Sequence, residues 1–342
     1  MRNCHLMLAL IVVVLAGAPA AAAEKIAVSA TRTTGSAAVY IAQAKGYFAA
    51  EGLDVDFVFF NAAQPVAVAV ASGDALVGIT GLTAALYNMG AKQSVKIIAG
   101  GSSEQTGYSN SAFVVSNESY AKGLRAPKDV LGHTFGLTQI GSSYHYVMIR
   151  LAAKYGMPLS ATKLVPLQSF ANVASAVIGN QVDAGLLQSN IALPAQNTGR
   201  AKVIGWAGDE VFRQSTGIFA LSKTLQARRD MLERFLRAYI KGATEYDEVF
   251  QKKNDQPAKE ARKEELLGII MKFSQLSRED VLEAVSFIDP QARLNVEDVR
   301  NQIASWKSLG MVDAAVEADA LIDLSFLPNA ASRGRKSRSH RD

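Results

Sequence analysis

A strand-helix-strand unit is encoded by the stretch Lys45-Gly46-Tyr47-Phe48-Ala49-Ala50-Glu51-Gly52-Leu53-Asp54-Val55-Asp56. Gly46 predicts the end of a helix and Gly52 a second tight turn, because glycine readily adopts the left-handed backbone that such turns need. Phe48 and Leu53 are expected to hold the turn against a core. The residues from Val55 onward begin a strand, so the stretch places a strand directly after a helix.

The same alternation of short apolar strands and helical patterns continues along the chain, which predicts an α/β fold with mostly parallel sheets. The expected strands of the first passage are 25–29, 55–59, 76–79 and 95–99. The rhythm restarts near Lys128, with strands after 131, over 163–166 and over 182–187. Residues 70–78 and 177–185 both read as a small-residue helix, a turn and a buried strand, which indicates two similar lobes. After 217–221 the chain is predicted to be largely helical.

The amino terminus has the layout of a cleavable signal peptide. Arg2 precedes an apolar run over 6–15, and small residues follow, with Ala21-x-Ala23 before Glu24 as the expected cleavage site. The run is too short to span a bilayer, which takes about 20 residues. The single cysteine, Cys4, lies before the run and not after it, so we expect neither a lipid anchor nor a thiol in the mature chain. That excludes disulfides, thiolate metal sites and cysteine nucleophiles.

The net charge of +5 is concentrated at the ends of the chain. Arg2 leaves with the signal peptide, and the tail from Ala331 carries five basic residues against Asp342, which gives +4 (5 − 1 = 4). The body is therefore close to neutral (5 − 1 − 4 = 0), whereas a nucleic-acid-binding domain needs a basic face. We expect no nucleic-acid partner, no stable insertion into a membrane and a disordered basic tail over 331–342.

Several motifs, in order, resemble the periplasmic solute-binding proteins of ABC importers, in the nitrate/sulfonate/taurine (NMT1/THI5-like) family. They are 46–55, 124–130 before Leu131-Gly132, 179–184, and 306–312 with Ile322-Asp323. The resemblance runs from about Ile26 to Ala330. One departure is Leu76, where the family usually has an aspartate, as at Asp183 in the second passage.

The resemblance implies a two-lobed periplasmic-binding-protein fold of type II, with two crossing segments that act as a hinge. We expect these segments near 113–116 and 208–217. The expected domains are a signal peptide (1–23), a discontinuous first lobe (24–113 and 216–330) and a second lobe (114–215). The resemblance also implies a periplasmic monomer that closes over a small-molecule ligand and works with an ABC permease and its ATPase.

The ligand site is expected at the carboxyl ends of the strands, next to helix N-termini. Five such loops are rich in hydroxyl, amide and glycine residues, as a hydrogen-bonding pocket would be. For any single Ser or Thr, plain helix capping is the competing interpretation. The predicted ligand-binding residues are Arg32, Thr33, Thr34, Gly35, Ser36, Thr80, Gly81, Leu82, Ser102, Gln105, Gly141, Ser142, Ser143, Tyr144, Gln188 and Asn190.

Arg32 is the only cationic side chain in these five loops. Because arginine pairs with carboxylate, sulfonate or phosphate groups, it favours a small organic anion, unless it is merely a surface residue. Tyr144 and Trp206 are candidates to pack on an apolar part of the ligand, with hinge or core as the alternative for Trp206. His145 either lines the cleft or is incidental. A neutral heterocycle fits the same loops, so the ligand class stays open.

Nothing in the sequence predicts catalysis, a metal or a cofactor. Without the signal peptide and the tail, His133 and His145 are the only histidines, and no hydrolase, phosphate-loop or dinucleotide motif is present. The family fold includes a thiamine-pyrimidine synthase branch with a cysteine-rich motif, which this chain lacks. The leading hypothesis is a binding protein that feeds an ABC importer. The alternatives are an exported binding module for a sensor system and, less favoured, a hydrolase or thiamine-pyrimidine-related enzyme on the same scaffold.

Overall fold

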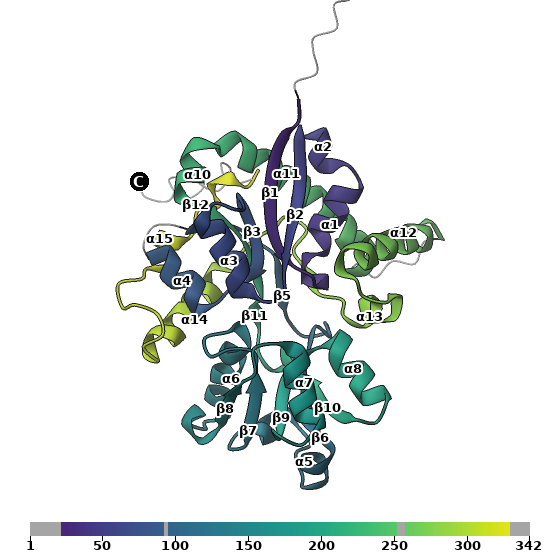
Figure 1. Cartoon of the computed structure of the whole chain (residues 1–342), viewed down its shortest axis with the longest axis vertical. Helices are drawn as coiled ribbons and strands as arrows, with labels where there is room; N and C mark the ends of the chain where they lie inside the picture. Colours follow the sequence, from purple (N-terminus) through teal and green to yellow (C-terminus); the bar gives the residue numbers. More distant parts are fainter. Residues whose placement is uncertain (1–21, 92–94, 252–256, 329–342) are drawn as a thin grey trace, which may run out of the picture.

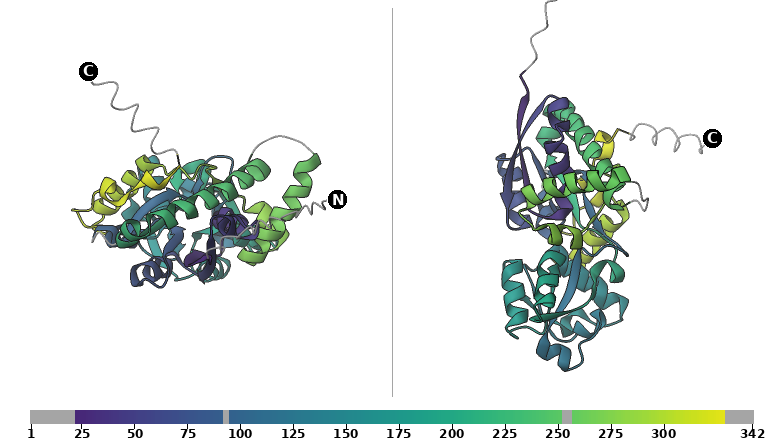
Figure 2. Two further views of the ribbon diagram at one scale, coloured as in Figure 1. Left: turned by 90° about the horizontal axis from the view of Figure 1, so that it is seen from above. Right: turned by 90° about the vertical axis from the view of Figure 1, so that its right-hand side faces the viewer.

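The computed structural model describes residues 22–91, 95–251 and 257–328 of the 342-residue chain. These residues form two α/β lobes joined by a narrow three-stranded sheet (Figure 1). The lobes lie one above the other along the long axis of the molecule, as the side view of Figure 2 shows. The predicted basic tail, and all but the last two residues of the predicted signal peptide, lie outside the described residues.

The first lobe is built on a five-stranded sheet in the order β2-β1-β3-β12-β4. Its first three strands are parallel, and β12 runs antiparallel to both of its neighbours. The strands are β1 (Glu24–Thr31), β2 (Leu53–Phe60), β3 (Val77–Gly81), β4 (Val95–Gly100) and β12 (Thr216–Leu221). Because β12 comes after the second sheet's strands in sequence, the strands of this sheet come from two separate stretches of the chain.

Helices cover both faces of this sheet, and a hydrophobic core lies on each face. The residues of one core come from α1 (Ala37–Ala44), α2 (Tyr47–Ala50), α10 (Ser222–Ala227), α11 (Arg229–Tyr246), α12 (Pro257–Ser274) and α13 (Arg278–Glu283). Those of the other come mainly from α3 (Ala63–Ser72), α4 (Ala84–Ala91), α14 (Val296–Ser308) and α15 (Ala318–Leu321). Short helical turns are η1 (Thr34–Ser36), η4 (Asp247–Gln251) and η5 (Leu324–Phe326).

The stretch 45–56 forms the two turns and the core contacts that its sequence predicts. Gly46 and Gly52 both have φ +71°, and Phe48 and Leu53 are buried in the core. The preceding helix, α1, packs closely against α11, because a Cβ on Gly242 would lie only 2.2 Å from the backbone oxygen of Ala38. The absence of a side chain at Gly242 is therefore what allows the two helices to approach.

The second lobe repeats the sheet of the first. Its order, β8-β7-β9-β6-β10, corresponds to β2-β1-β3-β12-β4, with the antiparallel strand again in fourth place. The strands are β6 (Ser111–Ser116), β7 (Thr134–Leu137), β8 (Lys163–Pro166), β9 (Ala184–Gln188) and β10 (Ala201–Trp206). The two passages that look duplicated, 70–78 and 177–185, lead from a helix into the middle strands β3 and β9.

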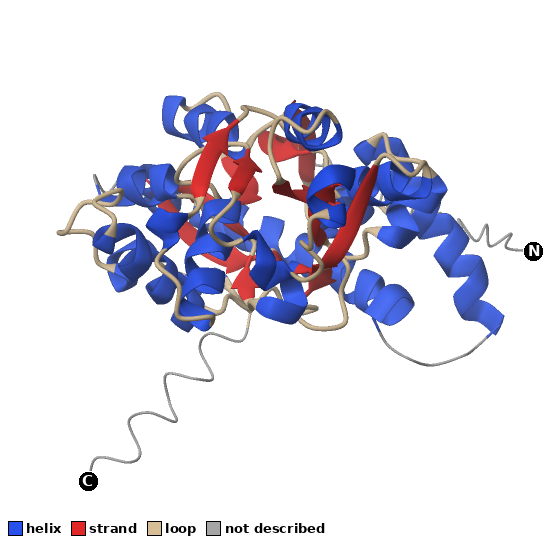
Figure 3. Ribbon diagram, turned by 90° about the horizontal axis from the view of Figure 1, so that it is seen from below, coloured by secondary structure: helices blue, strands red, loops and turns tan. Residues whose placement is uncertain are grey.

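The helices of the second lobe lie on both sides of its sheet (Figure 3). They are α5 (Asn117–Ala121), α6 (Ser143–Lys154), α7 (Phe170–Ile178), α8 (Ser189–Asn197) and α9 (Ala207–Glu210), with the turns η2 (Pro127–Val130) and η3 (Leu159–Ala161). In the described part of the chain, no helix is both long enough and apolar enough to cross a membrane.

The hinge is an antiparallel sheet of β5 (Ser102–Glu104), β11 (Arg213–Gln214) and β13 (Phe287–Ile288), in the order β11-β5-β13. The segment predicted over 208–217 does cross here, as β11. The other crossing segment, predicted near 113–116, lies elsewhere. That stretch belongs to β6, which is fully buried and pairs on both sides within the second sheet. The first crossing is β5, and we therefore propose lobe boundaries at β5 and β11.

The end of the described chain returns to the edge of the first sheet. Ile322 forms a parallel bridge with Ile97 on β4, and the Asp323 N–H donates a 2.9 Å hydrogen bond to the Ile97 carbonyl. An edge strand with unpaired backbone groups is a site for unwanted pairing with another chain. The C-terminal segment covers part of that edge.

Candidate functional site

A cleft of about 480 Å³ lies between the two lobes, beside the hinge. It is lined by loops at the carboxyl ends of strands from both lobes and by residues of β5 and β11, which is where open α/β sheets place their crevices. The predicted residues that line it are Arg32, Thr33, Gly35, Thr80, Gly81, Ser102, Ser142, Ser143, Tyr144 and Gln188.

Three predicted residues of the first lobe do not line the cleft, because other partners hold them. The Thr34 hydroxyl donates to the Ala284 carbonyl at 2.6 Å, and the Ser36 hydroxyl donates to the Thr31 carbonyl at 3.2 Å. Leu82 is fully buried within a core cluster. These side chains stabilise the loop that carries the lining residues.

Three others also lie away from the cleft. Gln105 lines a separate cavity of about 320 Å³ beside β11. The Gly141 N–H donates to Nδ1 of His145 at 3.1 Å, and its carbonyl accepts from the Ala84 N–H of the first lobe. Asn190 is half-buried in the first turn of α8.

Helix capping explains part of the hydroxyl content of these loops. The Ser142 hydroxyl accepts the His145 N–H at 3.3 Å and so caps α6. The Ser169 hydroxyl caps α7 in the same way, accepting the Asn172 N–H at 3.2 Å. At α3, by contrast, the N-cap residue is Ala62, which provides no side-chain cap. The first N–H groups of α3 are therefore left for solvent or a ligand.

Arg32 lines the cleft but is held against the first lobe. Its Nη1 donates a 2.6 Å hydrogen bond to the Phe273 carbonyl, and its guanidinium carbon lies 3.9 Å from the centre of the Phe59 ring. The side chain thus contributes a positive charge beside the cleft, while part of its hydrogen-bonding capacity is already used.

The sequence interpretation missed a second arginine, Arg213 on β11. Its side chain is 2% exposed, and its Nη2 lies 3.2 Å from Oε1 of Glu104, on the other crossing strand β5, whose side chain is 0% exposed. The guanidinium carbon also lies 5.1 Å from the centre of the Tyr144 ring. Arg213 lies in the predicted crossing segment 208–217. Because it does not follow a predicted strand, the strand-end rule does not identify it.

Tyr144 comes from the first turn of α6 and joins the second lobe to this group. Its hydroxyl shares a 2.8 Å hydrogen bond with the Ser111 hydroxyl at the start of β6. Burial, with the nearby Glu104 carboxylate adding to it, raises the pKa of Tyr144 well above its ordinary value. The phenol therefore stays protonated at physiological pH, and it presents a neutral polar group.

The cleft is also lined by two strand-end loops that are not among the five predicted from the sequence. Residues 60–63 follow β2, and residues 169–171 follow β8. They bring Phe60 and Phe170 to the cleft, one from each lobe. The strand-end rule, applied to every strand, would have found both loops.

Trp206 and His145 do not line the cleft. Trp206 ends β10 and packs against a core cluster of the second lobe, as the core alternative predicted. His145 is buried with its ring centre 5.2 Å from that of Trp306, a residue of the first lobe. Burial lowers the pKa of His145 to about 4, so the imidazole is neutral.

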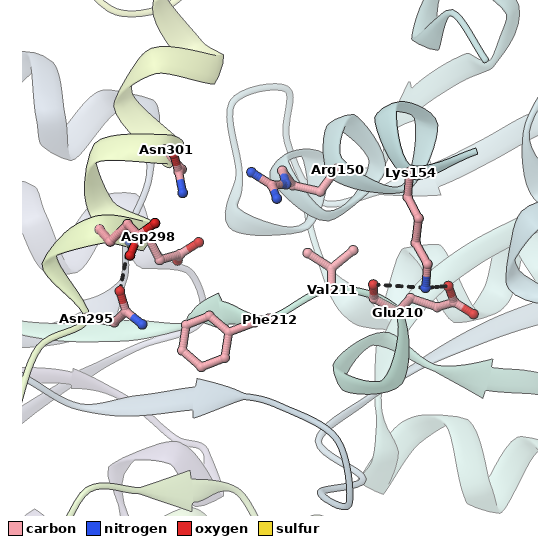
Figure 4. A pocket seen from close by; sticks show the side chains of 9 residues that line it. Arg150, Lys154, Glu210, Val211, Phe212, Asn295, Asp298 and Asn301 are labelled. Atoms are coloured by element: carbon pink, nitrogen blue, oxygen red, sulfur yellow. Dashed lines mark hydrogen bonds and ion pairs between the residues drawn. The ribbon is translucent and has the colours of Figure 1, made fainter. Parts of the chain in front are cut away.

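Another cavity, of about 540 Å³, lies between α6, α9 and the start of α14 (Figure 4). Phe212 lines it, whereas the next residue, Arg213, borders the cleft. Figure 4 shows Arg150 and Lys154 from the second lobe opposite Asp298 and Asn301 from the first. Lys154 is already paired with Glu210 at 2.6 Å. The cavity holds none of the five strand-end loops that the sequence singled out.

The structure resembles several solved binding proteins. It is similar to the periplasmic aliphatic sulphonate-binding protein SsuA of Escherichia coli (TM-score 0.68, 15% identity, covering 88% of this chain and 92% of that one). It is also similar to the periplasmic nitrate-binding protein NrtA of Synechocystis (0.68, 14%, 93% and 89%). A third is the ligand-binding component of an ABC-type import system from Staphylococcus aureus (0.70, 13%, 89% and 97%).

These likenesses confirm the predicted two-lobed periplasmic-binding-protein fold. No curated protein sequence matches the chain significantly. The family model described as "NMT1/THI5 like" matches residues 33–248, which is more than half of the chain and includes both crossing strands. The chain therefore belongs to the NMT1/THI5-like family.

Proposed function

We propose that this protein is the substrate-binding component of an ABC importer, which captures a small organic anion in the interlobe cleft and delivers it to a membrane permease. The observation that carries the proposal is the cleft, which both lobes line with strand-end loops on either side of a two-strand crossing. The named functions of SsuA and NrtA support a solute-binding role, and the predicted signal peptide supports export to the periplasm.

The two crossing strands favour closure of the lobes around a ligand. Within the described residues, β5 and β11 are the strands that cross between the lobes. They pair over two positions, Arg213 with Glu104 and Gln214 with Ser103. Short segments of this kind absorb the backbone changes of a hinge. A ligand that touches both lobes binds the closed form better than the open one, so it shifts the population toward closure.

A thermal-shift screen followed by small-angle scattering tests the proposal. The screen covers sulfonates, carboxylates, nitrate and uncharged heterocycles, and scattering is then measured with and without each stabilising compound. We expect at least one small solute to stabilise the protein and to reduce its radius of gyration. If no solute does both, the proposal is wrong.

The fate of the ligand separates the remaining alternatives. A binding protein returns its ligand chemically unchanged after long incubation, whereas a hydrolase does not. Reconstitution with an ABC permease and its ATPase separates import from signalling to a sensor. Solute uptake that depends on this protein indicates import.

A further inference from the structure

The strongest unexplained feature of the cleft is a set of buried donors without partners. Arg213 pairs with Glu104 through Nη2, and among the described residues its Nε and Nη1 have no hydrogen-bond partner. The hydroxyl of Thr80, which is 1% exposed, also has none. Both residues border the cleft. Buried polar groups are nearly always paired in native proteins, so unpaired donors beside a cavity indicate a ligand that pairs with them.

The two residues belong to one corner of the cleft. Thr80 lies opposite Gly217 in the β3–β12 pairing, and the Leu82 N–H donates to the carbonyl of Ser215, two residues after Arg213. Gly81, the next residue after Thr80, brings the two lobes into contact at this corner. A Cβ there would lie 3.5 Å from the Ser143 hydroxyl of the second lobe and 3.7 Å from Ala63, at the start of α3. The uncapped N-terminus of α3 therefore opens beside the same corner.

The charges around the cleft define the charge of its ligand. Among the described residues that line it, Arg32 and Arg213 are the charged ones, and no carboxylate lines it with them. Glu104, which lies behind Arg213, balances one of these two positive charges. The site is left with a net charge of +1, and a single negative charge neutralises it. Desolvating an unbalanced charge is costly, so the site favours a monoanion over a dianion or a cation.

The rest of the lining is suited to an apolar body. Phe60 from the first lobe and Phe170 from the second border the cleft, together with Ala62, Ala63 and Ala171. The Phe170 ring also packs on that of Tyr144, with ring centres 5.3 Å apart. An aromatic or compact aliphatic group fits between such walls, whereas a second charged group finds no partner there.

We infer that the ligand is an organic monoanion whose oxyanion head binds Arg213 and Thr80, with its apolar body between Phe60 and Phe170. This inference rests on the proposed function and goes further by moving the anchor from Arg32 to the hinge strand β11. Arg32 supplies charge, while Arg213 supplies free donors from a buried position, where a charge-assisted hydrogen bond is strongest.

Calorimetric titration of paired probes tests the inference. The monoanions are acetate, benzoate, methanesulfonate, benzenesulfonate and nitrate; the comparison compounds are acetamide, benzamide and the dianion sulfate. We expect at least one organic monoanion to bind at least tenfold more tightly than its amide or than sulfate. Arg213→Gln should weaken that binding more than tenfold, and Thr80→Val, which keeps the shape of the side chain, should weaken it several-fold.

Two other arginines serve as comparisons. Arg32→Gln should weaken binding less than Arg213→Gln, because it removes charge but no free buried donor. Arg237→Gln, which breaks an exposed ion pair with Glu51 on the first lobe, should leave binding unchanged. Circular dichroism shows whether Arg213→Gln is folded. Thr80→Val tests the same subsite without the loss of a buried charge.

The outcomes separate this inference from the proposed function. If no monoanion binds, or if Arg213→Gln and Thr80→Val both bind the anion as the parent protein does, the monoanion subsite is wrong. A neutral compound that binds and closes the lobes would then leave the proposed function standing. If no compound binds and none changes the radius of gyration, both fail.

Discussion

The hydroxyl of Tyr146, on α6 of the second lobe, donates a 3.0 Å hydrogen bond to Oδ1 of Asp298, on α14 of the first lobe. The other oxygen of Asp298 accepts from the Gln214 N–H of β11 at 2.7 Å and from the Gln302 side chain at 2.8 Å. The buried carboxylate of Asp298 thus links the two lobes and the hinge strand β11. This link is additional to the two crossing strands themselves.

Tyr146→Phe should loosen this connection. A hydrogen bond to a charged group contributes about 1.5–3 kcal/mol, so we expect the free energy of unfolding to fall by about that amount. The unliganded protein should also be more open, which chemical denaturation and small-angle scattering will show. Tyr155→Phe is the matched control, because Tyr155 bonds a carboxylate, Glu210, within the second lobe. If the two variants scatter alike, Asp298 does not restrain opening.

Acid should destabilise the protein through His145. The pKa of His145 is about 4 in the folded protein and about 6.5 in an unfolded chain, so the unfolded state binds a proton first as the pH falls. The free energy of unfolding should therefore decrease between pH 6.5 and 4, by at most about 3 kcal/mol from this residue. Above pH 6.5, His145 is mainly neutral in both the folded and the unfolded state, so it does not lower the free energy of unfolding there.

His145→Gln should flatten that part of the stability–pH curve. Its Oε1 can replace Nδ1 as the acceptor of the Gly141 N–H, so that the fold is kept. His133→Gln is the control, since His133 is 44% exposed and lies in a turn. Urea denaturation at pH 4.5 and 7.5 gives the slope, and equal slopes in the parent protein and His145→Gln would contradict the assignment.

Glu104→Gln should change the charge preference of the cleft. The net charge of Arg32, Arg213 and Glu104 rises from +1 to +2, so binding of sulfate should improve relative to benzenesulfonate by about tenfold, or about 1.4 kcal/mol. Glu118→Gln, which removes an exposed carboxylate paired with Lys122, is the control. Titration of both anions measures the ratio, and an unchanged ratio in a folded variant would refute the charge argument.

Gly242→Ala should destabilise the first lobe, because the new Cβ would lie 2.2 Å from the Ala38 backbone oxygen and force α1 and α11 apart. Overpacking of this kind costs about 1–3 kcal/mol. Gly268→Ala is the matched control, since nothing lies within 4 Å of its Cβ position on α12. Alanine there should stabilise the helix by about 0.5–1 kcal/mol. Thermal unfolding should shift in opposite directions, and a shared direction would contradict this account of the packing.

Local signals account for the parts of the fold that could be predicted. The turns at Gly46 and Gly52 depend on the residues themselves. Side-chain caps are equally local: Ser277 accepts the Asp280 N–H, and Asn295 accepts that of Asp298. The strands 25–29 and 95–99 also form, within β1 and β4. Each of these features is decided within a few residues, which a single sequence displays.

The crossing strands could not be predicted in the same way. β5 and β11 are three and two residues long, too short for a periodic pattern, and their pairing joins distant parts of the chain. β6 has a clear apolar run, but whether such a run pairs in a sheet or crosses between lobes depends on strands that come later. The lobe boundary that we propose therefore lies at β5 instead of near 113.

The lining of the cleft was predicted in part, but the proposed anchor, Arg213, was not. The strand-end rule found ten of the lining residues because it follows from the topology alone. The rule does not predict that Arg32 contacts the Phe59 ring and the Phe273 carbonyl. Nor does it predict the ion pair between Glu104 and Arg213. Those contacts join residues far apart in sequence, and only the folded chain brings them together.

The position of β12 has a consequence for the order in which the chain folds. The second sheet uses only residues 111–206, so it can close as soon as that continuous stretch exists. The first sheet needs β12 between β3 and β4, and β12 follows the whole second lobe. Until it arrives, β4 has no neighbouring strand in its sheet, and these long-range contacts slow folding. The lobe whose synthesis begins first is therefore the lobe whose sheet is completed last.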